Sequence, residues 1–75
     1  MKGKIGMRLQ SDVTGKFYRP DRCCFITNPK QAALYIKHGA ELLDLLIDRG
    51  DMLVYVFDKA ATSQLYRKWQ NYQLV

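Results

Sequence analysis

The chain has 75 residues, of which 48% are hydrophobic and 25% are charged, and its net charge is +5. This length allows one domain with a small core, since about 60% of the unfolded surface can be buried at such a size. The longest apolar run is far shorter than the roughly 18 residues that cross a bilayer, and no apolar segment follows Lys2 and Lys4 as it would in a signal peptide. We therefore expect a cytoplasmic protein with reduced cysteines and no membrane contact.

The excess positive charge is concentrated near the N-terminus. Residues 1–22 carry six basic and two acidic side chains, whereas residues 23–75 carry six basic and five acidic ones. We therefore predict a basic, partly flexible N-terminal arm over residues 1–16 and a single α+β domain over residues 17–75. A basic arm either improves solubility or attracts a polyanion such as nucleic acid.

Little regular structure is predicted within this N-terminal segment. Alternation at Ile5, Met7 and Leu9 is compatible with a short strand. Residues 11–15 have the composition of a turn, and residues 16–19 are compatible with a second extended piece. The arm is therefore expected to be largely irregular, and one further strand in it stays open.

A short strand followed by a capped helix is predicted next. Residues 23–27 include one aromatic and two β-branched residues, as is typical of a strand. Asn28 is a suitable helix N-cap, Pro29 suits the first helical position, and Gln31 completes an Asn-x-x-Gln capping box. Gly39 can adopt the left-handed conformation that ends a helix.

A β-hairpin is predicted over residues 41–58. Its first half fits a helix as well as a strand, but Gly39 breaks a long helix, and the turn Arg49-Gly50-Asp51 precedes an apolar run typical of β-structure. We expect Gly50 to provide the positive φ of a tight turn. The carboxylates at positions 44, 48 and 51 do not match a calcium loop, so a solvated sheet edge is the favoured interpretation.

The last predicted element is a helix over residues 59–73, capped by Asp58. Its apolar face would consist of Ala61, Leu65, Trp69 and Tyr72, which are spaced by three or four residues. The element order β-α-β-β-α predicts a small two-layer α+β domain. Its mainly antiparallel sheet would have three strands, or four if the arm contributes one, with both helices on one face.

Three segments together resemble a family of short proteins from bacteria, phages and other mobile elements, which carries the label of a domain of unknown function. The likeness covers roughly residues 17–72 and consists of the helix Thr27-Asn-Pro-Lys-Gln-Ala-Ala-Leu-Tyr-Ile-Lys-His-Gly39, the strand end Val54-Tyr-Val-Phe-Asp58, and a last helix with Leu65 and Trp69. Tyr55 and the longer basic arm depart from the family pattern. The resemblance implies a phage or mobile-element context, and it implies no catalytic residue.

The adjacent cysteines and the single histidine do not form a predicted metal or catalytic site. Zinc usually requires four ligands, whereas Cys23, Cys24 and His38 supply three, and strand alternation would separate the two thiols. The thiols are expected to pack as small hydrophobic groups. No pair of a nucleophile and a base, and no phosphate-binding loop, is recognisable, so we expect no catalytic residue, no cofactor, no small-molecule substrate and no enzymatic activity.

The apolar strand 52–57 has two apolar faces, and both require a cover. The helices can cover one face, while the second needs the arm, a second copy of the chain, or a ligand. The expected interaction surface consists of Tyr18, Phe25, Leu53, Tyr55 and Phe57.

Two functions follow from these patterns. The favoured one is a protein-interaction module that forms a homodimer or binds a host or phage protein. The alternative is a nucleic-acid-binding accessory protein, in which phosphates contact the basic side chains of Lys2, Lys4, Arg8, Lys16, Arg19, Arg22, Arg67 and Lys68.

Overall fold

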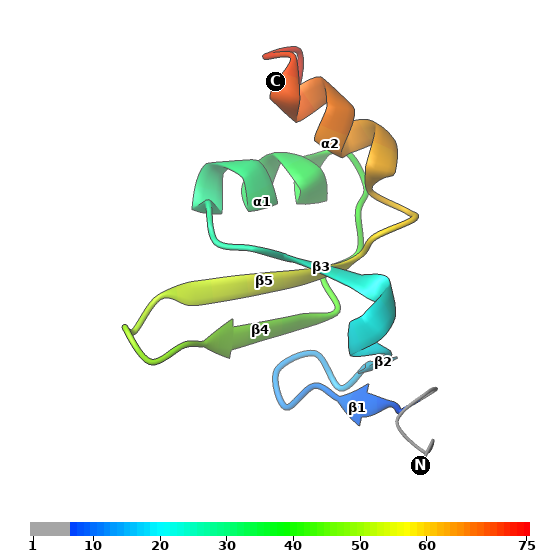
Figure 1. Ribbon diagram of the computed structural model, residues 1–75, viewed down its shortest axis with the longest axis vertical. Helices are drawn as coiled ribbons and strands as arrows, with labels where there is room; N and C mark the ends of the chain where they lie inside the picture. The colour runs from blue at the N-terminus through cyan, green and yellow to red at the C-terminus, as the bar shows by residue number, and fades with distance from the viewer. Residues whose placement is uncertain (1–6) are drawn as a thin grey trace.

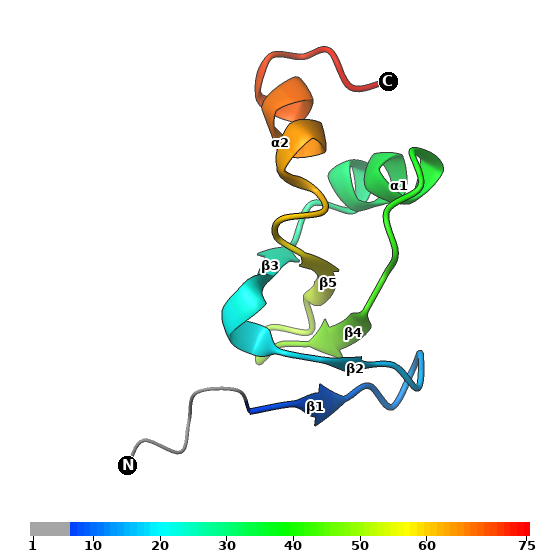
Figure 2. The ribbon, with the colours of Figure 1, turned by 90° about the vertical axis from the view of Figure 1, so that its right-hand side faces the viewer.

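A computed structural model describes residues 7–75 and shows three layers. Helices α1 (Pro29–Lys37) and α2 (Ser63–Gln70) lie on one side of a three-stranded sheet (Figure 1). A two-stranded hairpin, β1 (Leu9–Gln10) and β2 (Phe17–Tyr18), lies on the other side (Figure 2). The predicted α+β class, with both helices on one face of the sheet, is confirmed, but the two predicted layers become three because β1 and β2 form a separate hairpin.

The central sheet consists of β3 (Cys23–Ile26), β5 (Leu53–Asp58) and β4 (Asp44–Ile47) in that spatial order. Both strand pairs are antiparallel, and the hairpin predicted over residues 41–58 forms β4 and β5. The strand with two apolar faces, β5, therefore occupies the centre. No fourth strand joins this sheet within residues 7–75, because β1 and β2 pair only with each other.

Alternation along β5 divides its side chains between the two layers, as predicted. Phe57 faces the helices, where it belongs to a core with Ala32, Tyr35 and Leu74. The rings of Tyr35 and Phe57 meet edge to face, with their centroids 5.3 Å apart. Val56 points to the opposite side and is also fully buried, so the second face has a cover as well.

Local side-chain chemistry sets both ends of α1. The Asn28 side chain accepts hydrogen bonds from the backbone N–H groups of Lys30 and Gln31, which confirms the predicted N-cap. The predicted capping box is wrong, because the buried Gln31 amide instead donates to the Tyr35 hydroxyl at 3.0 Å. Gly39 has a φ of +94° and ends the helix as expected.

The N-terminal hairpin, residues 9–18, corrects the predicted arm. Tyr18 and Ser11 are buried against the sheet, and the predicted turn at residues 11–15 joins β1 to β2. A boundary at residue 16 would therefore cut through a packed unit. The part of the arm at residues 1–6, including the strand position Ile5, lies outside the described residues.

The turn between β4 and β5 uses a different residue from the one predicted. Asp51 adopts the left-handed conformation, with a φ of +61°, whereas Gly50 has no positive φ. The Asp48 carboxylate stabilises the turn by accepting from the backbone N–H groups of Gly50 at 2.8 Å and Met52 at 3.0 Å. Aspartate tolerates the left-handed region better than most residues, so it can take this position.

The last helix begins later than predicted. The Asp58 carboxylate accepts from the backbone N–H of Ala61 at 2.8 Å, and the Thr62 hydroxyl donates to the Asp58 carbonyl at 2.9 Å. These bonds hold residues 59–62 as turns, so α2 starts at Ser63. Of the predicted apolar face, Leu65 and Trp69 pack on the core, while the side chains at positions 61 and 72 are exposed.

Candidate functional site

Charge is segregated within residues 23–75, although this part of the chain is nearly neutral in sum. Residues 29–40 and 59–75, which contain the helices, carry five basic side chains and no acidic one, whereas residues 41–58 carry five acidic side chains and one basic one. The helical end of the molecule is therefore strongly positive. Its five cations are all exposed, and they are Lys30, Lys37, Lys59, Arg67 and Lys68.

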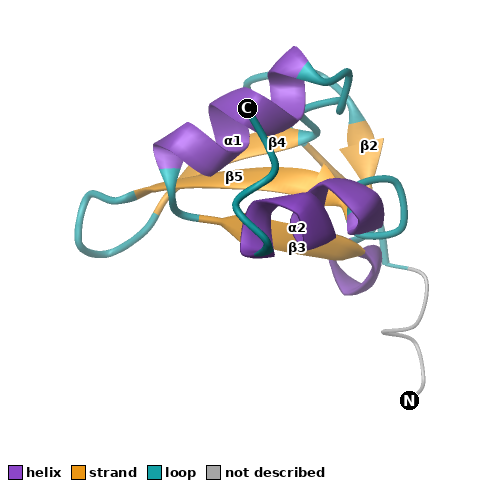
Figure 3. Cartoon of the chain, turned by 90° about the horizontal axis from the view of Figure 1, so that it is seen from above, coloured by secondary structure: helices purple, strands orange, loops and turns teal. Residues whose placement is uncertain are grey.

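A cavity of about 650 Å³ lies beside α2 at this positive end. Both helices lie above the sheet (Figure 3), with α2 farther from it than α1 (Figure 1), and the cavity is bounded by residues of β3, α1 and α2. Two cations contribute to a lining that is otherwise apolar, aromatic or neutral. The lining consists of Cys24, Phe25, Ile26, Tyr35, Lys59, Thr62, Ser63, Tyr66, Arg67 and Gln70.

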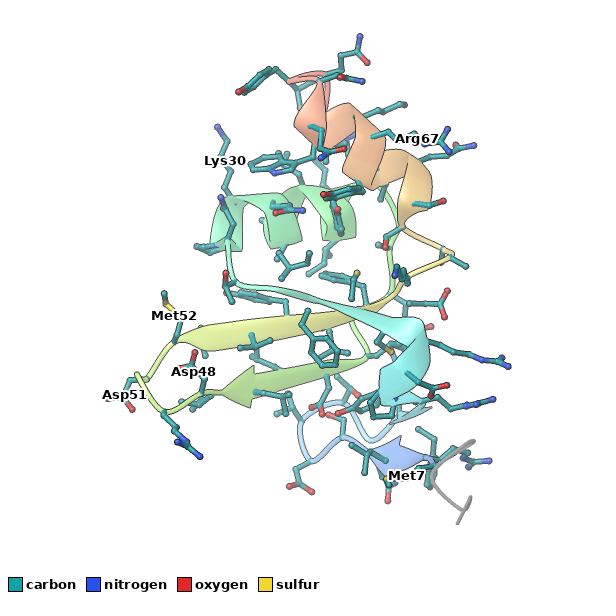
Figure 4. All side chains as sticks on the ribbon, viewed as in Figure 1. Met7, Lys30, Asp48, Asp51, Met52 and Arg67 are labelled. Atoms are coloured by element: carbon teal, nitrogen blue, oxygen red, sulfur yellow. The ribbon has the colours of Figure 1, made fainter. Side chains whose placement is uncertain are left out.

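A second cavity of about 640 Å³ adjoins the first. Both cavities include Tyr66 and Gln70, and the Gln70 amide donates to the Tyr66 hydroxyl at 3.0 Å. The second lining consists of Lys30, Tyr66, Trp69, Gln70, Tyr72, Leu74 and Val75. We refer to the two adjoining cavities as the helical groove. Figure 4 shows Lys30 and Arg67, one from each cavity, on different helices at this end of the molecule.

The chain reversal after α2 forms one wall of the helical groove. Tyr72 has a φ of +58°, which ends the helix and turns the last residues back towards α1. Leu74 is consequently buried in the core, while the Tyr72 ring is 95% exposed. His38 Nε2 lies 2.7 Å from a terminal carboxylate oxygen of Val75 and holds the returning segment in place. The groove therefore has a defined wall and an accessible aromatic ring.

The composition of the helical groove suits binding rather than proton transfer. Neither lining contains an aspartate, a glutamate or a histidine, although three cations line the groove. Burial raises the pKa of Tyr35 and outweighs the opposing hydrogen bond with Gln31, so this phenol is neutral at physiological pH. The groove can thus offer positive charge and aromatic faces to an anionic, planar ligand.

Several of the predicted phosphate-binding cations already have another partner. Lys16 Nζ lies 2.9 Å from a Glu41 carboxylate oxygen, and Arg19 lies 3.1 Å from the Asp21 carboxylate. The Arg8 guanidinium stacks 4.6 Å from the centre of the Phe17 ring. The two carboxylates offset part of the positive charge at Lys16 and Arg19, and the stacking holds the Arg8 guanidinium against the hairpin.

The other members of that predicted set are divided between locations. Arg22 is exposed at the end of the 3₁₀ turn η2 (Pro20–Arg22), whereas Arg67 and Lys68 lie on α2 at the helical end. Lys2 and Lys4 lie outside the described residues. The structure thus does not bring the described cations of the set into one patch, and sequence reasoning missed Lys30, Lys37 and Lys59. The absence of acidic residues near these three lysines was the signal that could have revealed them.

The predicted interaction surface is also divided. Tyr18 and Phe57 are buried, and Tyr55 is half-buried in the helix-facing layer. Leu53 faces the same layer as Tyr55, while Phe25 pairs with Val56 on the opposite face. These side chains therefore belong to two faces of the sheet, because strand neighbours alternate.

A buried carboxylate joins the N-terminal hairpin to the sheet. Asp44 is 4% exposed and accepts hydrogen bonds of 2.5 Å from both the Ser11 and the Tyr18 hydroxyl groups. The prediction that the Asp44 carboxylate lies at a solvated sheet edge is therefore wrong. Burial raises its pKa, but hydrogen bonds from Ser11, Tyr18 and the Leu45 N–H outweigh burial, and the pKa is lowered. Burial and the contact with Asp44 raise the pKa of Tyr18 to about 12.

The cysteines and the histidine play separate roles. Cys23 and Cys24 are free thiols on opposite faces of β3, and the Cys24 sulfur lies 3.5 Å from the Thr62 hydroxyl. Burial, with the nearby Asp58 carboxylate, raises the pKa of Cys23, which disfavours a reactive thiolate. Residues 7–75 contain no cluster of three or more side chains suited to holding a metal ion.

Comparison with family models, curated proteins and solved structures found no match for this chain. The resemblance to the phage and bacterial family therefore stays a prediction. Between residues 7 and 75, no helix is both long enough and apolar enough to cross a membrane.

Proposed function

We propose that this chain is a small non-enzymatic accessory protein that binds nucleic acid through its helical end. The segregation of charge carries this proposal, because the five cations of residues 29–40 and 59–75 are all exposed and these segments contain no acidic side chain. Phosphate backbones are attracted by such a surface, and their release of counterions contributes to affinity. The mobile-element context implied by the resemblance is compatible with this role.

The proposed surface differs from the N-terminal arm that the sequence suggested. Lys16 in the N-terminal hairpin and Arg19 just after it already lie beside carboxylates, whereas Arg67 and Lys68 have no acidic neighbour on their own helix. Glu41, which follows α1, is engaged by Lys16. Carboxylates therefore neutralise less of the positive charge at the helical end than at the hairpin.

Binding of a labelled oligonucleotide across a range of salt concentrations tests this function. Affinity should fall steeply with salt, and replacing Arg67 and Lys68 by glutamine should reduce the slope by roughly 0.7–0.9 for each phosphate that the variant no longer neutralises. Arg49→Gln is the matched control, since Arg49 is the single cation among residues 41–58. The proposal fails if neither single-stranded nor duplex DNA binds at low salt, or if the control weakens binding as much as the helix variants do.

Self-association is a second candidate function, favoured by apolar side chains on the far face of the sheet. Phe25 is 48% exposed and Leu46 is 38% exposed, although Val56 between their strands is fully buried. The N-terminal hairpin thus covers only part of this face. A second copy that covers the remainder would add burial to a core that is small for an independent domain.

A further inference from the structure

We propose that the helical groove selects single-stranded over duplex nucleic acid by stacking bases on its aromatic side chains. This inference rests on the proposed function and names its ligand class. The three aromatic residues that α2 and its C-terminal turn contribute are Tyr66, Trp69 and Tyr72. Each lines the second cavity, and Tyr66 also lines the first.

Exposure of the rings makes stacking feasible. Tyr66 is 48% exposed and Tyr72 is 95% exposed, while Trp69 is partly buried because it packs against the core. The hydrogen bond from Gln70 holds the Tyr66 ring at the junction of the two cavities. An unpaired base presents a flat face to such a ring, whereas a base within a duplex is already stacked on its neighbours.

A single strand carries a phosphate at every nucleotide, and both cavities contain cations beside their aromatic side chains. Lys30 lines the second cavity, and Lys59 and Arg67 line the first, so cations accompany the aromatic side chains along the whole helical groove. No acidic side chain lines either cavity. Surfaces that bind single strands combine a positively charged groove with aromatic side chains on which bases stack. This combination favours an anionic polymer over an apolar peptide as the ligand.

Trp69 is the only tryptophan of the chain, so its fluorescence reports on the second cavity alone. The test titrates the full chain with a thymidine oligonucleotide of about 15 nucleotides and with a duplex of equal length. We expect the single strand to quench Trp69 emission and to bind more tightly than the duplex. Tyr66→Ala should weaken single-strand binding by about tenfold and leave duplex binding unchanged, whereas Tyr66→Phe should retain it.

Controls separate this inference from the proposed function. Phe17→Ala removes an exposed aromatic ring of the N-terminal hairpin, outside the helical groove, and should leave binding unchanged. Circular dichroism of Tyr66→Ala verifies that the variant is folded. Equal binding of single strand and duplex, or full single-strand affinity in a folded Tyr66→Ala protein, overturns the stacking proposal and leaves charge-driven binding intact. Absence of binding to both probes at low salt overturns both.

Discussion

At the scale of single residues, two glycines differ in what their positions require. Gly39 has a φ of +94°, a conformation that costs other residues about 1–2 kcal/mol. Gly50 has no positive φ, and an added Cβ there would meet only an Asp48 carboxylate oxygen at 3.6 Å. The end of α1 therefore requires a glycine at position 39. In the turn between β4 and β5, the left-handed residue is Asp51.

We expect Gly39→Ala to lower the free energy of unfolding by about 1–2 kcal/mol. Nothing lies within 4 Å of an added Cβ at Gly39, so the loss would come from backbone strain alone. Gly50→Ala is the matched control and should stay within about 0.5 kcal/mol of the wild type. Urea denaturation of both variants measures the difference, and an equal or larger loss in Gly50→Ala would contradict this assignment.

Asp44 is the residue whose ionisation matters most for stability. Its pKa is lower in the folded chain than the usual value of 3.8, so the folded state favours the charged carboxylate. The stabilisation is therefore complete above the unfolded pKa and is lost as the pH falls through the folded pKa. The Ser11 and Tyr18 hydroxyl groups donate to this buried carboxylate, so replacing Asp44 also weakens these two hydrogen bonds.

Asp44→Asn should lower the free energy of unfolding by about 1–3 kcal/mol near neutral pH. The gap between the variant and the wild type should narrow as the pH is lowered from about 5 towards about 2. Chemical denaturation at several pH values measures this gap, with Asp12→Asn as the control, since Asp12 is an exposed carboxylate of the same hairpin turn. A gap that is constant across this range would show that Asp44 ionisation does not contribute.

At the scale of elements, the N-terminal hairpin is attached to the sheet by side chains. Every hydrogen bond from residues 9–18 to the rest of the described chain starts from a side chain of the hairpin, whereas its backbone bonds are internal. Besides the two bonds to Asp44, Thr14 donates to the Leu43 carbonyl at 2.7 Å and Lys16 donates to the Leu42 carbonyl at 3.3 Å. The hairpin can therefore detach without breaking the ladder of the central sheet.

Native-state hydrogen exchange should show this separate opening. The Ser11 and Gly15 amides bond within the hairpin, and the Leu43 amide bonds to Val56 in the central sheet. In Tyr18→Phe, which removes one bond to Asp44, we expect faster exchange at Ser11 and Gly15 and unchanged exchange at Leu43. Equal acceleration at all three amides would mean that the hairpin and sheet unfold as one unit.

At the scale of the whole molecule, the cations of the helical end and the exposed apolar side chains of the sheet lie on different sides, except that Phe25 also borders the first cavity. The helical layer is positive, while the far face of the sheet keeps Phe25 and Leu46 exposed beside the N-terminal hairpin. Charge-driven binding weakens with salt, whereas apolar association does not. The two candidate functions therefore make opposite predictions about salt.

If the far face pairs with a second copy, the mass from light scattering should rise with protein concentration and should persist at high salt. Phe25→Ser should abolish this rise, because Phe25 lies on the uncovered part of that face. Phe17→Ser serves as a control, since Phe17 is a similarly exposed ring on the N-terminal hairpin. A monomeric mass at every concentration would rule out self-association.

Elements that depend on neighbours in the chain were predictable from the sequence. The Asn28 cap, the left-handed Gly39 and the alternation along β5 each involve residues only a few positions apart. The charge segregation could also have been predicted from the sequence, because all five acidic residues beyond position 22 lie between residues 41 and 58. The helical groove could not, since it forms only when α1, β3 and α2 meet.

The sequence by itself determined the class, the order of the elements and the two apolar faces of β5, because hydrophobic period and capping chemistry act locally. Only the tertiary structure decided what covers the second face. The Ser11–Asp44 bond joins residues 33 positions apart, so no local pattern indicated that a carboxylate between leucines would be buried. The cover comes from contacts between distant segments, which residue spacing does not encode.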